Sequence, residues 1–112
     1  MVLLDSKQVE QFQRDGYLPI GPLLTLDQVG ALRTALDELW TQWARSLGVS
    51  LGEYRRVVSQ WTNVWESHPV LDAQLRVPQL AAMAATLINC QRVRLFHDHV
   101  ILMPPELSYS IF

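Results

Sequence analysis

The sequence predicts an α+β domain in which helices come first and a strand comes last. Segment 25–47 repeats its apolar residues every three or four positions, which is the period of one helical face. Segment 92–103 alternates and runs apolar, which is typical of a strand. The 112 residues are enough for one domain, 1–112, with a core of its own.

The first predicted element is a short amphipathic helix that begins at residue 5 or 6. Asp5 and Gln8 have the spacing of a capping box, and Gly16 stands where a helix commonly ends in a left-handed residue. Residues 17–20 are then expected to form a short strand. Because Pro19 has no N–H to donate, we expect this strand at a sheet edge.

The longest predicted helix covers residues 25–47. Thr25 and Gln28 form a second capping-box pattern, and Asp27 lies in the first turn, where the helix dipole favours a negative charge. Gly48 follows the last turn. The apolar stripe consists of Val29, Leu32, Leu36, Leu39, Trp40, Trp43 and Leu47. A stripe of this length must pack against another part of the domain.

Segment 50–65 carries two patterns. Its apolar residues keep a helical period after Ser50, whereas residues 54–61 are rich in strand formers. We expect a short helix that gives way to extended chain by about Gln60. Further along, Pro69 and Pro78 each suit the first position of a helix. The second of these helices is expected to end near Asn89.

The last predicted element is a strand over residues 92–103, stopped by Pro104 and Pro105. Side chains alternate along a strand, so His97 and His99 share one face and Asp98 lies on the other. No hairpin partner is visible in the sequence. One long strand without a partner indicates an incomplete sheet, and we therefore expect that sequence is missing.

Composition excludes several classes of function. The net charge of −2, with both signs interspersed, gives no basic surface for nucleic acid. No apolar run is long enough to span a membrane or to form a signal peptide, so a cytoplasmic protein is the default expectation. Cys90 is the single cysteine, which excludes an internal disulfide and a cysteine-based metal site. We expect it to be a buried thiol.

Five segments together resemble the phytanoyl-CoA dioxygenase family. They are Phe12 followed by GYLPI at 16–20, LDELW at 36–40, QWTNVWE at 60–66, PQLAAMAATL at 78–87 and RVRLFHDH at 92–99. The resemblance covers residues 8–105, in order. It implies N-terminal helices followed by the first strands of an incomplete double-stranded β-helix, a jelly-roll or cupin-like barrel.

The resemblance also implies a chemistry, which is hydroxylation of small molecules with Fe(II), 2-oxoglutarate and O₂. The iron of the family sits on two histidines and one carboxylate. Its His-x-Asp motif follows a Pro-Pro pair like Pro104-Pro105, and a distal histidine comes much later. Neither occurs within these residues, so we expect no catalytic residue, no metal ligand and no bound cofactor for this chain alone. Residues 106–112 form a divergent tail that does not resemble the family's continuation.

Four residues are weak candidates for facing the pocket that the resemblance implies: Gln60, Asn63, His97 and His99. His97 and His99 could hold a metal as a pair, but they supply no carboxylate, and we favour structural roles for both. Gln60 and Asn63 could equally satisfy local backbone groups. Where many relatives have a lysine before the Pro-Pro pair, this chain has Met103, which cannot pair with a carboxylate.

Three functional hypotheses follow. The first is a truncated oxygenase that is inactive alone, with Fe(II) and 2-oxoglutarate belonging to the full-length family. The second is a binding or regulatory module that pairs with a partner, or with itself, through the exposed strand 92–103. The third is one piece of a split oxygenase, completed by a second chain that carries the missing ligands.

Overall fold

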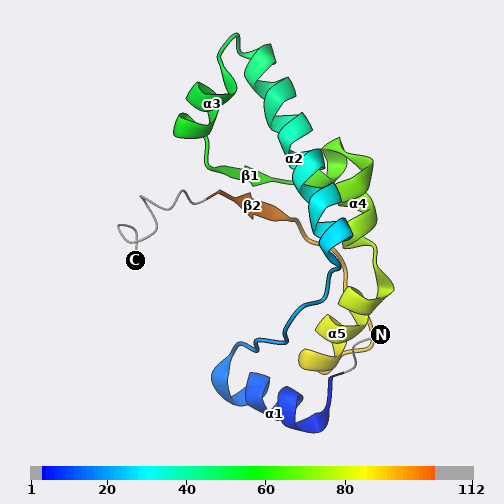
Figure 1. The fold of residues 1–112 in the computed structure, drawn as a ribbon. Coiled ribbons are helices and arrows are strands. Elements are labelled where there is room, and N and C mark those ends of the chain that lie inside the picture. The colour runs from blue at the N-terminus through cyan, green and yellow to red at the C-terminus, as the bar shows by residue number, and fades with distance from the viewer. Residues whose placement is uncertain (1–3, 103–112) are drawn as a thin grey trace.

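The structure is a computed structural model that describes residues 4–102 (Figure 1). Its helices are α1 (Ser6–Asp15), α2 (Leu26–Ser46), α3 (Leu51–Val57), the 3₁₀-helix η1 (Val64–Ser67), α4 (Pro69–Leu75) and α5 (Pro78–Leu87). Strands β1 (Gln60–Thr62) and β2 (His99–Ile101) form a two-stranded antiparallel sheet. This mixture of helix and strand confirms the α+β class. Within residues 4–102, no helix is long and apolar enough to cross a bilayer.

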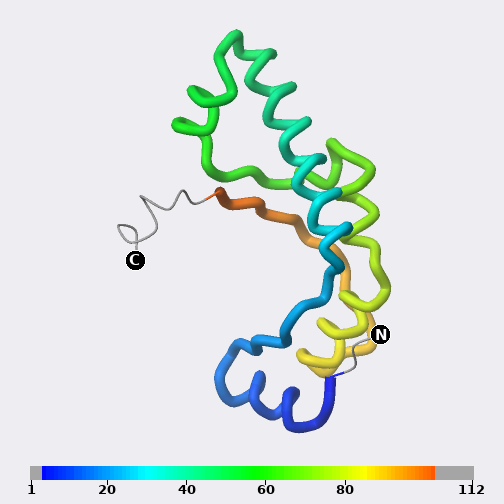
Figure 2. Tube along the Cα trace, viewed as in Figure 1, coloured from blue at the N-terminus to red at the C-terminus, as the bar shows by residue number. Residues whose placement is uncertain are grey.

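The described chain follows an arc (Figure 2). Helices α2, α3 and α4 and the β1–β2 ribbon lie at one end, and α1 and α5 lie at the other (Figure 1). Gln13 in α1 joins the two helices of the second end, because its Nε2 donates to the carbonyl oxygen of Leu87 at 2.6 Å. Helix α1 buries no residue. We call the end formed by α2, α3, α4 and the ribbon the packed end, because it contains the core cluster.

Helix α1 begins and ends as the sequence predicts. The Asp5 carboxylate accepts from the N–H of Gln8 at 2.8 Å, and Gln8 Oε1 accepts from the N–H of Asp5 at 2.9 Å. Gly16 follows in the left-handed region at φ 81°. The strand predicted over 17–20 is wrong, since those residues have no ladder partner. Strand propensity alone could not hold this segment extended in a sheet, because no neighbouring strand lies there.

Helix α2 supplies one wall of the core and confirms the predicted apolar stripe in part, since Leu39 and Trp40 are buried whereas Leu47 is 65% exposed. Thr25 and Gln28 form the predicted capping box. Its residues Ala35, Leu39, Trp40 and Ala44 are buried. The two alanines let the facing elements approach closely, while the larger side chains fill the space between them.

The predicted change from helix to extended chain at Gln60 is confirmed. The Ser50 hydroxyl accepts from the N–H of Glu53 at 3.1 Å and starts α3, which ends at Val57. Strand β1 then begins at Gln60. Both patterns in segment 50–65 were real, because the helix and the strand follow one another within it.

Trp61 is the centre of the core. Its ring lies 4.9 Å from the ring of Trp40, and its Nε1 donates to the Tyr54 hydroxyl at 2.9 Å. The core cluster comprises Ala35, Leu39, Trp40, Ala44, Tyr54, Trp61, Val64 and Leu71. Met83 is the one other buried side chain among the described residues, so the core is small for a chain of this length.

The prediction of a long strand without a partner over residues 92–103 is wrong in both respects. Only His99–Ile101 forms a strand, and it pairs with β1, with Trp61 opposite Val100. Strand β1 is short because Asn63 turns into the left-handed region at φ 56° and starts η1. Residues 92–97 therefore have no partner strand among residues 4–102. Met103 lies outside the described residues.

Two prolines start helices as expected. Pro69 opens α4, where His68 Nδ1 accepts from the N–H of Val70 at 3.2 Å, and Pro78 opens α5. Asn89 follows α5 in the left-handed region at φ 53°. The expectation of a buried Cys90 is wrong, since its thiol is exposed. It lies in the turn after α5, outside the core end of the arc.

Replacing the buried hydroxyl beside Trp61 tests this core. The Tyr54→Phe variant leaves the indole N–H of Trp61 buried without an acceptor. We expect the free energy of unfolding to fall by about 1–2 kcal/mol in urea denaturation. Tyr17→Phe is the matched control, since Tyr17 is 65% exposed, and should change stability by less than about 0.5 kcal/mol. Equal effects of the two substitutions would contradict the role of the Trp61–Tyr54 hydrogen bond.

Candidate functional site

The candidate residues lie on and beside the β1–β2 ribbon, which has two different faces. Trp61 and Val100 are opposite one another on the face that packs against α2 and α3. The other face carries Gln60 opposite Ile101, and Thr62 opposite His99, and all four of these residues are exposed. We call this surface the open face, and it consists of Gln60, Thr62, His99 and Ile101.

The structure brings two of the four sequence candidates together. Gln60 and His99 both lie on the open face, on neighbouring strands. His97 is also exposed, but it precedes β2, and its ring packs edge-on against Phe96 at 4.6 Å between centroids. Asn63 has turned away from the strand, and its backbone N–H donates to the carbonyl oxygen of Asp98 at 3.1 Å.

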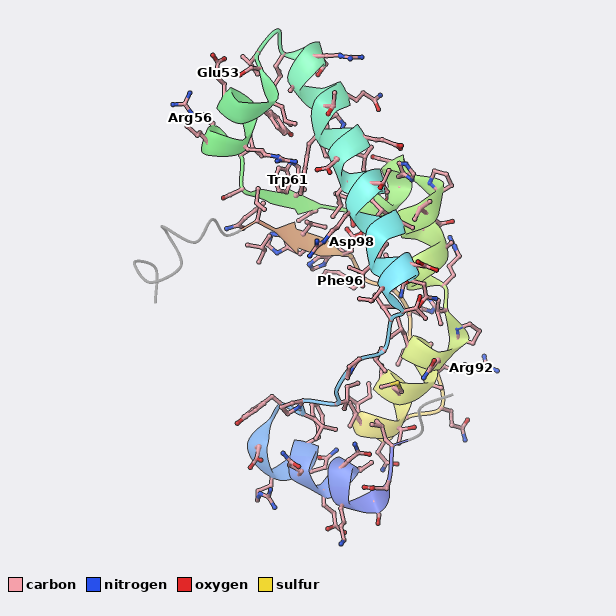
Figure 3. All side chains as sticks on the ribbon, viewed as in Figure 1. Glu53, Arg56, Trp61, Arg92, Phe96 and Asp98 are labelled. Carbon is pink, nitrogen blue, oxygen red and sulfur yellow. The ribbon has the colours of Figure 1, made fainter. Side chains whose placement is uncertain are left out.

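Asp98 makes the most informative polar contact in this region. Its Oδ1 accepts from the N–H of Val64 at 2.8 Å, and its Oδ2 accepts from the N–H of Trp65 at 3.1 Å. These two donors are at the start of η1, where backbone N–H groups have no partner within the helix. Figure 3 labels Asp98 beside the start of β2. We call this pair of hydrogen bonds the Asp98 clasp.

The Asp98 clasp was missed by sequence reasoning. The predicted alternation placed Asp98 on the opposite face from His97 and His99. This placement is the one feature of the sequence that bears on the clasp. The partners of the carboxylate are backbone groups 33 and 34 positions away, which leave no mark on residue type. An aspartate that caps a helix is normally found next to that helix in the sequence, whereas Asp98 comes from the residue directly before β2.

The side chains near the ribbon that could bind a metal do not fit the iron that the family resemblance implies. A facial triad needs one carboxylate and two histidines converging on one point. Both oxygens of Asp98 are engaged by η1, on the side of the strand away from His99. Among residues 4–102 there is no group of three or more His, Cys, Asp or Glu side chains placed to hold a metal.

The remaining histidine has a structural role between α2 and α4. His68 Nδ1 accepts from the N–H of Val70, so the ring proton is on Nε2, which lies 2.8 Å from Glu38 Oε2. One imidazole thereby caps α4 and ties it to α2. Arg76 lies over the ring of Trp65 at 5.7 Å and pairs with Asp72. These contacts fix the packed end of the arc and leave the open face uncovered.

A depression of about 390 Å³ lies between α5 and the segment that follows it. It is lined by Ala81, Ala82, Ala85, Gln91, Arg92, Val93 and Arg94. None of the four candidate residues lines it, and its polar groups are the ends of Gln91 and two arginines. It is a shallow contact between a helix and an extended segment rather than a second site with converging side chains.

No protein family, curated protein or solved structure matches this chain. Its function is therefore inferred from its own residues and from their arrangement.

Removing the Asp98 carboxylate tests the clasp. The Asp98→Ala variant leaves the N–H groups of Val64 and Trp65 without acceptors, and we expect a loss of about 2–3 kcal/mol of stability. Asp98→Asn retains one acceptor and should lose less. The control is Glu66→Ala, an exposed acid on η1 itself, with an expected change below about 0.5 kcal/mol. If Asp98→Ala is as stable as the control in urea denaturation, the clasp contributes nothing.

Proposed function

We propose that residues 8–105 are the N-terminal part of an Fe(II) and 2-oxoglutarate oxygenase of the phytanoyl-CoA dioxygenase type. We propose in addition that residues 1–112 by themselves hold no iron. The observation that carries the proposal is the open face of the ribbon. Its reverse is packed against helices, while the open face presents Gln60, Thr62, His99 and Ile101, which no other part of residues 4–102 covers.

A ribbon with one packed face and one open face is what we expect of strands in a double-stranded β-helix. In a barrel or jelly roll that encloses a ligand, one face of each strand lines the interior and the other contacts the outer layer. Trp61 and Val100 face the helical layer. In such a barrel, Gln60 and His99 would therefore line the interior. The ribbon would be the first part of the barrel wall.

The second part of the proposal, that this chain holds no iron, rests on the side chains near the ribbon that could bind a metal. Asp98 is held by η1, and His97 contacts Phe96 beside the ribbon rather than on it. His99 is thus left as a single imidazole on the open face. One imidazole does not select Fe(II), so the ligands of a catalytic iron would have to come from elsewhere.

A binding module is the alternative, and exposed apolar residues beside β2 favour it. Phe96 is 90% exposed and Leu95 is 48% exposed, in the segment directly before the strand. Exposed apolar side chains next to a free strand edge are typical of sites that receive another strand. A split oxygenase combines both hypotheses, since a second chain would then bind here and supply the ligands.

The coding region after codon 112, read in all three frames, tests the family assignment. The proposal predicts a His-x-Asp motif shortly after the Pro-Pro pair and a distal histidine, in the same frame, a shifted frame or a neighbouring gene. A downstream region with neither motif in any frame would contradict it.

Iron binding tests the second part. Purified protein of residues 1–112, titrated anaerobically with Fe(II) in the presence of 2-oxoglutarate, should give no saturable heat and no visible charge-transfer absorption. His99→Ala serves as the matched variant and should give the same titration. Stoichiometric binding that is lost in His99→Ala would show that the open face is itself a metal site.

A further inference from the structure

His68 uses both of its ring nitrogens to join two helices. Its Nδ1 accepts from the N–H of Val70 at 3.2 Å, at the start of α4, and its Nε2 lies 2.8 Å from Glu38 Oε2 on α2. The side chain is 17% exposed. Only the neutral ring with its proton on Nε2 can accept at Nδ1 and donate to the carboxylate at the same time. The double contact therefore requires one particular form of the imidazole.

The first turn of α4 depends on this acceptor. Pro69 has no N–H, so the first backbone donor of the helix is that of Val70. The helix spans seven residues, a length at which an isolated helix is not stable in water. Leu71, in the same turn, is buried and belongs to the core cluster. The cap thus holds a turn that carries part of the core.

We infer that protonation of His68 releases the first turn of α4, which makes this residue a pH-sensitive cap. An imidazolium carries a proton on both nitrogens, so Nδ1 becomes a donor that faces the N–H of Val70. Its positive charge also lies at the N-terminal end of a helix, where the dipole disfavours a cation. The contact with Glu38 persists, because Nε2 still donates and the two groups then carry opposite charges. The ring stays on α2 while α4 loses its cap.

Charged groups from three elements face the ring. Glu38 contacts it from α2, while Glu66 of η1 and both Asp72 and Arg76 of α4 line a depression of about 310 Å³ together with His68. The carboxylates favour the charged ring and Arg76 opposes it, but Arg76 is paired with Asp72 at 2.7 Å. These surroundings hold the protonated ring in place, so the change falls on the cap. The inference is independent of the proposed function, since it concerns α4 and not the ribbon.

NMR of the full 112-residue chain tests the cap, with the pH lowered from about 8 to about 5, the range in which histidine side chains change charge. Protection of the Val70 amide against hydrogen exchange is measured relative to an unstructured peptide at the same pH. We expect it to fall at least about fivefold as the ring of His68 gains its second proton, which the ring nitrogen signals report. The Gln28 amide should keep its protection, because its cap is the hydroxyl of Thr25, which does not change charge.

His68→Asn is the matched variant. Asparagine is among the preferred N-cap residues, and its side-chain oxygen accepts from the same N–H without changing charge. The protection of Val70 in this variant should be the same at both pH values. His68→Ala lacks the acceptor and should show the lower protection at both.

Three results would overturn the inference. Undiminished protection of Val70 once the ring is protonated would mean that the turn does not need the neutral form. An equal loss of protection in His68→Asn would place the cause at another group. A ring that stays neutral down to about pH 5 would mean that the contact does not respond to pH in the range where histidines change charge.

Discussion

The Asp98 clasp is the contact on which the packed end of the molecule depends. One carboxylate holds the first two N–H groups of η1, and the backbone of the same residue accepts from Asn63. These bonds fix the point where β1 turns into η1, and with it the register of β1 against β2. Trp61 is thereby placed between Trp40 and Tyr54, and the core forms around it.

The same contact decides what the ribbon can do. Since Asp98 is turned toward η1, the open face keeps a histidine and polar neighbours without a carboxylate. In the proposed oxygenase, a face of this composition would line a pocket rather than hold the metal. The opposite face of the ribbon packs against α2 and α3. In the proposed oxygenase, the packed end would belong to the outer layer of the barrel, and the exposed Phe96 and Ile101 would lie where further structure covers them.

The helices were predictable because their signals are local. Asp5 with Gln8, Thr25 with Gln28, and the two helix-starting prolines act within one turn, and each lies where the sequence indicates. The strands were predictable only in part, since a strand exists where another strand pairs with it. Segments 17–20 and 92–97 have strand-like composition but no partner strand in the described part of the chain. The clasp was not predictable, because its acceptor and donors are far apart and the donors are backbone groups.

Hydrogen exchange at Val64 and Trp65 measures the central claim most directly. If Asp98 serves the fold, both amides exchange far more slowly than in an unstructured peptide, and adding Fe(II) with 2-oxoglutarate leaves their rates unchanged. These two amides are the first of η1, where protection can come only from a capping group. Rapid exchange at both positions, or protection that is lost when Fe(II) is added, would show that the carboxylate is free for a metal and would contradict the account.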